Sequence, residues 1–188
     1  MNKIKYLLLV ITGFILTPVL RGQPMGIKAK TFYIVRHAEK DTGNNPAISA
    51  AGKNRAGDLY RVLKNKKIDL ILVSQFRRSG MTADSLRIYK NIDTLHYTAD
   101  ATSDLILKKI ISSAGNAKSI LIIGHSNTLP SIIKKLGVEN YLQKDIPDTE
   151  YDHLFIVKYK SGKAILQSKK YGSHSVLPAK AAQMNLLQ

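Results

Sequence analysis

The strongest constraint on the fold is a short segment that is apolar at every position and ends in two basic side chains. Residues 32–35 are Phe, Tyr, Ile and Val, and such a run is typical of a strand buried on both faces inside a parallel sheet. Arg36 and His37 follow without a turn. Open α/β sheets bind their ligands at the carboxyl ends of the strands, so the segment predicts that Arg36 and His37 lie in a binding site.

Strand and helix patterns alternate along the rest of the chain. Further short apolar strands are predicted at 69–73, 92–97 and 119–123. Helical patterns begin at Ser49, after the 74–83 segment, at Ser103 and at Thr128. Four strand–helix units predict an α/β fold, a three-layer sandwich whose mainly parallel sheet has helices on both faces. Residues 154–159, a turn at 160–163 and a returning strand at 164–168 predict a C-terminal antiparallel hairpin at one edge.

The third and fourth predicted helices carry recognisable start and stop signals. Ser103 is the predicted cap, with Leu105, Ile106, Ile110 and Ile111 as the inner stripe. The fourth helix has Pro130 in its first turn and Gly137 as its stop. Both helices are therefore expected to pack on the sheet through isoleucine and leucine.

The N-terminus resembles a targeting segment rather than part of the fold. Lys3 and Lys5 precede a mostly apolar run at 6–20, the layout of a secretory signal peptide. We expect residues 1–23 to be a cleaved signal and 24–188 to be a single catalytic domain of an exported, periplasmic or secreted protein. The alternative is a membrane anchor at 4–20, although this run is short against the roughly 20 apolar residues that span a bilayer.

Composition narrows the possible chemistry and partners. The chain has no cysteine, which excludes disulfides, thiolate metal sites and a cysteine nucleophile. Its net charge is +16, and +13 without Lys3, Lys5 and Arg21, which favours phosphorylated small molecules, anionic lipid or nucleic acid as partners. No RNA-binding signature or zinc-finger spacing is present, so specific nucleic acid binding is not predicted. Membrane contact is expected only if the N-terminal segment stays uncleaved.

Basic residues follow three of the predicted strands: Arg36 and His37, then Arg78, then His125. Since parallel strands end at one edge, these residues are expected to converge. Guanidinium groups match phosphate geometry, and a neutral imidazole can attack phosphorus while the second imidazole donates hydrogen bonds. Gly124 is expected to let the backbone approach the anion. The pattern predicts phosphoryl transfer.

A metal site is the competing interpretation of these residues. Glu39 lies two positions after His37 and could ligate a cation together with it. Two histidines and a carboxylate beside two arginines make a poor cation site. We therefore expect neither a metal nor another cofactor.

Three segments resemble the signatures of the histidine phosphatase superfamily, also called the phosphoglycerate mutase-like family. They are Arg36-His37-Ala38-Glu39, residues 74–83 with Arg78, and Gly124-His125-Ser126-Asn127-Thr128. Residues 45–52 are similar to the family's loop-to-helix entry. The resemblance covers about 31–168, and the chain resembles the small bacterial phosphatases of the family.

The resemblance implies a role for each matched residue. His37 would be the phosphorylated nucleophile, with Arg36, Arg78 and His125 completing the phosphate pocket. Glu39, Ser126 and Asn127 would bind substrate.

One departure concerns the general acid. The glutamate that mutases and many phosphatases carry after the third strand has no clear counterpart here. Asp100 is the nearest substitute by position, followed by Asp104 and Glu39. Some small members that act on phosphohistidine do without this acid because their leaving group is a nitrogen base.

The expected function is that of a metal-independent phosphatase. It would hydrolyse a phosphomonoester, or phosphohistidine, through a phosphohistidine intermediate on His37, with a phosphorylated small molecule or a phosphoprotein as partner. The alternatives are a non-catalytic phospho-ligand-binding protein on the same fold and a phosphoglycerate-type mutase. The identity of the phosphate ester and the oligomeric state stay open.

Overall fold

The computed structural model describes residue 27 and residues 30–141 and 145–175. The predicted signal segment, residues 1–23, lies outside this range. The elements in chain order are β1 (Thr31–Arg36), α1 (Ala50–Leu63), β2 (Leu70–Ser74), α2 (Arg77–Lys90), β3 (Thr94–Tyr97), α3 (Asp104–Ser113), β4 (Ser119–Gly124), α4 (Leu129–Lys135), β5 (His153–Lys160) and β6 (Lys163–Lys170). In this part of the chain no helix is long and apolar enough to cross a membrane.

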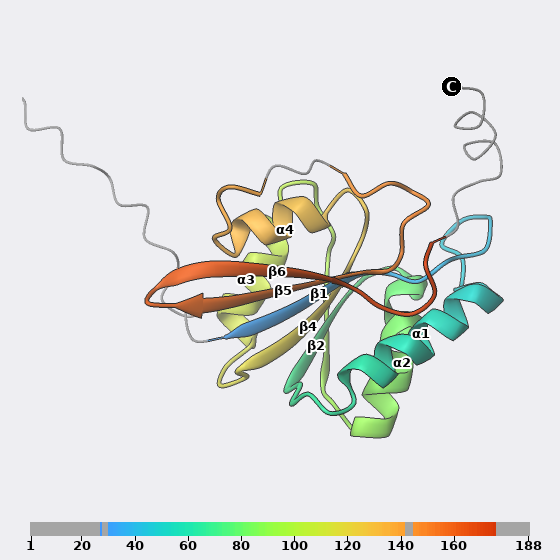
Figure 1. Cartoon of the computed structure of the whole chain (residues 1–188), viewed down its shortest axis with the longest axis horizontal. Coiled ribbons are helices and arrows are strands. Elements are labelled where there is room, and N and C mark those ends of the chain that lie inside the picture. Colours follow the sequence, from blue (N-terminus) through green and yellow to red (C-terminus); the bar gives the residue numbers. More distant parts are fainter. Residues whose placement is uncertain (1–26, 28–29, 142–144, 176–188) are drawn as a thin grey trace, which may run out of the picture.

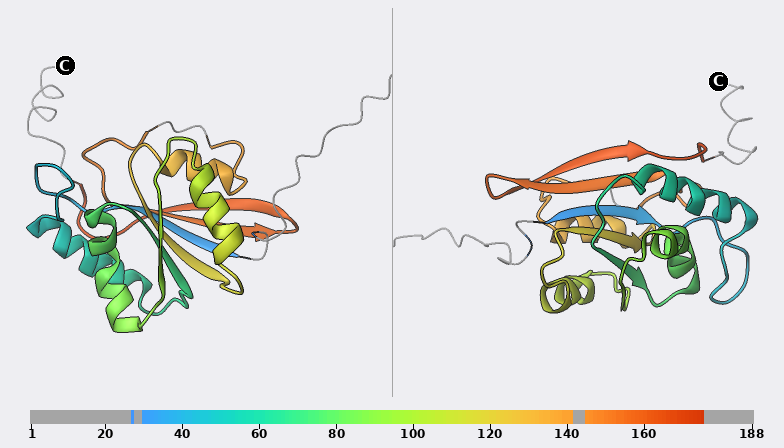
Figure 2. Two further views of the ribbon diagram at one scale, coloured as in Figure 1. Left: turned by 180° about the vertical axis from the view of Figure 1, so that it is seen from behind. Right: turned by 90° about the horizontal axis from the view of Figure 1, so that it is seen from below.

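The strands form one mixed six-stranded sheet in the order β3-β2-β4-β1-β5-β6. The strands β1 to β4 are parallel, whereas β5 runs antiparallel to β1 and pairs with β6 as a hairpin. The right-hand view of Figure 2 shows this hairpin at one edge of the sheet. The predicted α/β class and the edge hairpin are confirmed.

Helices cover both faces of the sheet, with α1 and α2 on one side and α3 and α4 on the other (Figure 1). Period-two alternation divides the side chains between the faces. In β1, Phe32 and Ile34 pack toward α3 and α4, while Tyr33 and Val35 pack toward α1 and α2. The continuous apolar runs are therefore explained by burial on both sides.

The start of α3 differs from the prediction. Ser103 makes no capping hydrogen bond and has a φ of 58°, so its predicted capping role is wrong. The Asp100 carboxylate accepts from the backbone N–H groups of Asp104 (3.1 Å) and Leu105 (3.3 Å) instead. A carboxylate also suits the positive end of a helix dipole better than a hydroxyl does.

The predicted inner stripe of α3 is too wide. Ile106 and Ile110, four residues apart, are each 2% exposed, whereas Leu105 and Ile111 are 42% and 49% exposed. Each exposed residue lies about 100° around the helix from its buried neighbour. The helix therefore contacts the rest of the fold through a narrow stripe.

Parallel pairing brings the carboxyl ends of three strands to one edge. Arg36 pairs with Gly124, and Val73 pairs with Ile123 one position earlier. A β-carbon at Gly124 would lie 2.5 Å from Leu129 Cδ1, so close packing against α4 accounts for this glycine. The predicted anion approach is not needed to explain it.

Candidate active site

A cavity of about 360 Å³ opens at this carboxyl edge. The residues expected in the site that line it are Arg36, His37, Arg78, Asp100, His125, Ser126 and Asn127. They come from the ends of β1 and β4, the start of α2 and the loop before α3. Of the residues expected to act on substrate, Glu39 is absent from the lining.

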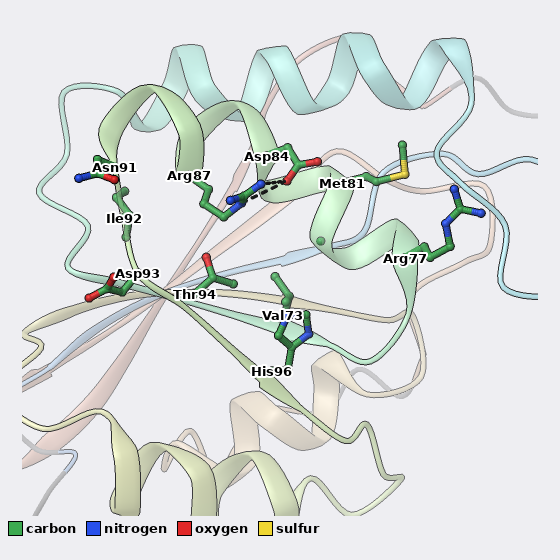
Figure 3. Close-up of a pocket in the computed structure, with 11 residues that line it drawn as sticks. Val73, Arg77, Met81, Asp84, Arg87, Asn91, Ile92, Asp93, Thr94 and His96 are labelled. Carbon is green, nitrogen blue, oxygen red and sulfur yellow. Dashed lines mark hydrogen bonds and ion pairs between the residues drawn. The ribbon is translucent and has the colours of Figure 1, made fainter.

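A larger cavity, about 800 Å³, lies between α2 and the edge strand β3 (Figure 3). Asp84 and Arg87 form an ion pair there, and His96 is at one side. The lining holds neither His37 nor His125. Since phosphoryl chemistry needs converging cations rather than volume, the smaller cavity is the better candidate.

His37 is buried, with 3% of its surface exposed. Its ring Nδ1 lies 2.8 Å from the carbonyl oxygen of Ala38. A carbonyl can only accept, so the proton is on Nδ1 and Nε2 carries the lone pair. Burial lowers the pKa of His37 to about 3, assisted by the positive field of Arg78 and Arg36. The ring is therefore neutral at neutral pH, with Nε2 available as a nucleophile.

The ring of His125 lies 5.1 Å from that of His37, centroid to centroid. Its Nδ1 is 3.4 Å from Arg78 Nη2, and its Nε2 is 2.8 Å from Ser74 Oγ. Because a guanidinium only donates, Nδ1 accepts and Nε2–H donates to Ser74. Burial, followed by the charges of Arg78 and Arg36, lowers the pKa of His125 to about 4. The two imidazoles are thus both neutral and adjacent.

Two serines behind His125 were not expected from the sequence. Ser74 Oγ is 2.7 Å from Ser79 Oγ, and both residues are buried. This pair holds the His125 ring from the side of α2. A serine at the carboxyl end of a buried strand, five residues before another, was the available signal.

Arg78 presents unused hydrogen-bonding capacity to the site. Its guanidinium lies 4.3 Å from the Phe76 ring centroid, and its Nε is buried without a hydrogen-bond partner in the described structure. Thr82 Oγ donates to the Arg78 carbonyl (2.7 Å) and accepts from the Ala38 N–H (2.9 Å). The first turn of α2 is therefore tied to the segment that carries His37.

Arg36 is held differently. Its Nη1 donates to the carbonyls of Pro147 (2.9 Å) and Glu150 (3.1 Å), and its Nη2 donates to Asp148 Oδ1 (3.1 Å). The Tyr151 ring stacks under the guanidinium, with Arg36 Cζ 4.0 Å from the centroid of the ring. The Nε alone is buried without a partner among the described residues. The fork of Arg36 therefore binds the loop before β5, and one N–H is left for an anion.

Asp100 lines the cavity but serves α3 at the same time. Burial raises its pKa, but hydrogen bonds from Thr102 Oγ and from the N–H groups of Asp104 and Leu105 together outweigh burial, and the net shift is downward. The carboxylate therefore stays ionised near neutral pH. In this state it accepts hydrogen bonds and has no proton to donate.

The other two candidate acids do not line the cavity. Asp104 Oδ1 is 2.5 Å from Lys135 Nζ. Glu39 receives hydrogen bonds from Arg55 Nε (2.8 Å) and Nη2 (2.7 Å), and Arg55 is itself buried and also binds the Tyr171 carbonyl. The structure therefore does not bring Glu39 to the cavity with the other expected residues, and its carboxylate neutralises a buried guanidinium instead.

Asp148 and Tyr151 enter the site without having been expected there. Asp148 lines the cavity, is 91% exposed, and accepts from Ser126 Oγ (3.3 Å) as well as Arg36. The acidic segment 145–152 was the sequence signal. Asp148 and Arg36 are more than a hundred residues apart in the sequence. Local sequence patterns cannot predict a contact over such a separation.

Outside the cavity, the described residues contain one group with metal-ligand geometry: Glu150, Asp152 and His153. The ammonium of Lys170 lies 3.3, 2.7 and 2.8 Å from their ligand atoms. A lysine already supplies the positive charge there. Asp152, considered above as part of an acidic segment, faces Lys170 rather than the active-site cavity.

Comparison with known proteins supports the fold through structure alone. No family model matches the sequence, and no curated protein matches it. Solved structures do match across most of the chain.

A protein provisionally assigned as the phosphohistidine phosphatase SixA of Agrobacterium tumefaciens is 18% identical, with a TM-score of 0.54, covering 77% of this chain and 97% of that one. The alpha-ribazole phosphatase of Shigella flexneri is 14% identical, with a TM-score of 0.55, covering 79% and 100%.

A mycobacterial glucosyl-3-phosphoglycerate phosphatase is 11% identical, with a TM-score of 0.52, covering 75% of this chain and 97% of that one. All three are phosphatases by name. The likeness shows the fold: the chain has the phosphoglycerate mutase-like α/β fold that the sequence predicted.

Proposed function

We propose that the protein is a metal-independent phosphatase that forms a phosphohistidine intermediate on His37. The observation that carries the proposal is a neutral imidazole with a fixed Nε2 lone pair, adjacent to a second imidazole and two arginines in one cavity. Phosphoryl transfer depends mainly on positioning and on stabilising the equatorial oxygens. The unpartnered N–H groups of Arg36 and Arg78 suit that task.

In the first step Nε2 of His37 attacks phosphorus, the Nε2–P bond forms and the bond from phosphorus to the leaving group breaks. The ring then carries positive charge, which the Ala38 carbonyl stabilises through Nδ1–H. Water next attacks phosphorus, the N–P bond breaks, and phosphate and free His37 result. A bound dianion offsets the arginine field around His125 and favours its protonated, hydrogen-bond-donating form.

The ionised state of Asp100 bears on the substrate. An alkyl phosphate needs a proton for its alkoxide, an effect worth roughly 10² to 10⁴ in rate. The phenolate of an aryl phosphate and the imidazole of a phosphohistidine leave with less need for protonation. We therefore propose a phosphomonoester with a good leaving group, or phosphohistidine, as the substrate. We expect a phosphohistidine peptide to be hydrolysed faster than a simple alkyl phosphate, and the two rates can be measured side by side.

The experiment is hydrolysis of an aryl phosphate by chelator-treated protein, alongside His37→Ala. We expect turnover to survive the chelator and to disappear in the variant. His96→Ala is the matched control, since His96 lines the larger cavity between α2 and β3. If the chelator stops the reaction while His37→Ala remains active, the proposal is wrong.

A non-catalytic phospho-ligand-binding protein is the second candidate, and the absence of a protonated carboxyl group at Asp100 motivates it. Calorimetric titration with an aryl phosphate separates the two. A binding protein gives a saturating heat signal with no free phosphate appearing, whereas the phosphatase releases product during the titration.

We also propose that the protein is exported, on the strength of Lys3, Lys5 and the apolar run at 6–20. A domain covering 24–188 would then be the mature protein. Determining the N-terminal residue of protein recovered from the producing cell tests this. A mature N-terminus near residue 24 indicates a cleaved signal, and Met1 retained in the membrane fraction indicates an anchor.

A further inference from the structure

The edge of the sheet opposite the active site carries a group of lysines that the proposed function does not use. Lys64, Lys66, Lys67 and Lys90, named here the lysine cluster, surround a hollow of about 440 Å³. They lie at the carboxyl ends of α1 and α2, which run side by side (Figure 1). All four side chains are exposed, and the lining of the hollow contains no carboxylate.

The arginines on the same two helices show that this concentration of charge is unusual. Arg61 pairs with Asp58, and Arg87 pairs with Asp84, each with an acid three residues earlier; the second pair is drawn in Figure 3. In the described residues none of the four lysines has an ion pair or a side-chain hydrogen bond. The helix dipoles stabilise cations at these ends, but four unpaired charges around one hollow also attract an external anion.

Large apolar side chains are exposed in the last turn of α2. Ile88 is 63% exposed and Tyr89 is 74% exposed, and they directly precede Lys90. The Tyr89 ring packs at 5.3 Å from that of Tyr60 on α1. Exposed aromatic and aliphatic groups flanked by lysine are typical of surfaces that lie in the headgroup region of a membrane.

The lysine cluster lies at the edge of the sheet at which β1 begins. The Thr31 N–H donates to the Lys118 carbonyl, and the Asp69 N–H donates to the Ser119 carbonyl. The start of β1 therefore lies at the same edge of the sheet as the start of β2, which directly follows the lysines at 64–67. The turn joining β5 and β6, with Lys160 and Lys163, lies at this edge too, since Val157 pairs with Phe32.

We propose that the lysine cluster, with Ile88 and Tyr89, docks on an anionic lipid surface. The lysines contact acidic headgroups, the two apolar side chains enter the interface, and the active-site cavity at the other edge of the sheet faces away from the membrane. The inference does not depend on the phosphatase activity. A lipid surface is favoured over nucleic acid because the exposed Ile88 and Tyr89 directly precede Lys90 on the same helix.

The test is sedimentation of the full-length chain with vesicles of phosphatidylcholine alone and with added phosphatidylglycerol. The N-terminal run contributes to both, so the measured quantity is the gain in binding that the anionic lipid gives. Substituting all four cluster lysines by Gln should reduce this gain at least about 100-fold, since each lysine near an anionic surface contributes about fivefold. Tyr89→Ala should reduce it several-fold.

The matched control removes the same charge elsewhere, with Lys53, Lys108, Lys134 and Lys169 all changed to Gln. These lysines are exposed and lie on other parts of the surface. We expect the control to lose no more than a few-fold in binding, and both variants to keep the wild-type circular dichroism and hydrolysis of a soluble aryl phosphate. An equal loss in both variants would overturn the proposal in favour of non-specific charge. Loss of duplex DNA binding by the cluster variant, with vesicle binding unchanged, would also overturn it.

Discussion

The two edges of the sheet use positive charge in opposite ways. At the carboxyl edge Arg36 is buried and Arg78 is half-buried, and both guanidinium groups lie against side chains of the cavity. At the amino edge the lysine cluster is exposed and unpaired. Enclosed guanidinium groups can position one anion for chemistry, whereas exposed ammonium groups attract any anionic surface. Substitutions at both edges and a pH titration of stability test this contrast.

Removing an enclosed cation should be far more costly for catalysis than removing an exposed one. Arg78→Ala should lower kcat/KM by about 10² to 10³, as for loss of one transition-state donor. Arg78→Lys should restore little, because an ammonium lacks the guanidinium's directed N–H groups. Steady-state kinetics on an aryl phosphate measure both.

Arg87→Ala is the control for that substitution, because Arg87 lies on the same helix and pairs with Asp84 away from the site. It should stay within about twofold of wild type, as expected for an exposed ion pair. If Arg78→Ala lowered kcat/KM no more than Arg87→Ala does, Arg78 would not stabilise the transition state.

The enclosed site should also make stability depend on pH. Burial lowers the pKa of His37 to about 3 and of His125 to about 4 in the folded state, against about 6.5 in the unfolded chain. Between these values the unfolded state binds more protons, so the free energy of unfolding should fall as pH is lowered from about 6.5 toward 4, by on the order of 3 kcal/mol for each histidine. Urea unfolding across this range measures it.

The double variant His37→Asn, His125→Asn should have a flatter profile than wild type, and His96→Asn should not. An unchanged slope in the double variant would assign the acid sensitivity to other groups.

The Glu39–Arg55 pair tests whether enclosure also matters for structure. Glu39→Gln leaves the buried Arg55 without its countercharge, so the protein should lose roughly 2 to 4 kcal/mol of stability. Asp58→Asn removes an acid whose partner, Arg61, is exposed, and should cost under about 1 kcal/mol. Chemical denaturation at neutral pH ranks the two, and equal costs would contradict the contrast.

The smallest expected effect is at the rim of the cavity. Asp148 is exposed and places negative charge near the site that should bind an anion. Asp148→Asn keeps an acceptor for Arg36 while removing this charge, so KM for an aryl phosphate should fall about two- to fivefold at low salt, and the difference should shrink as salt rises. Asp145→Asn, outside the cavity lining, should change nothing. An increase in KM would indicate that Asp148 binds substrate instead.

Local patterns predicted the scaffold and the convergent cations, because each depends on neighbours within a few residues. The buried run at 32–35 fixes β1, and parallel order then brings Arg36, His37, Arg78 and His125 to one edge. What failed depends on distant partners. The role of Glu39 follows from Arg55, sixteen residues away, and the use of Arg36's fork follows from a loop more than a hundred residues later. The start of α3 failed for a local reason, since two residues could cap it and the carboxylate of Asp100 does so.

The central claim is that Nε2 of His37 receives the phosphoryl group. Protein quenched in alkali during turnover of an aryl phosphate, then analysed by tandem mass spectrometry and phosphorus NMR, locates that group directly. The structure predicts a phosphoryl group on His37, attached to Nε2 because Nδ1–H is bound to the Ala38 carbonyl. A phosphoryl group on His125, attachment to Nδ1 of His37, or turnover with no phosphorylated protein at all would contradict it.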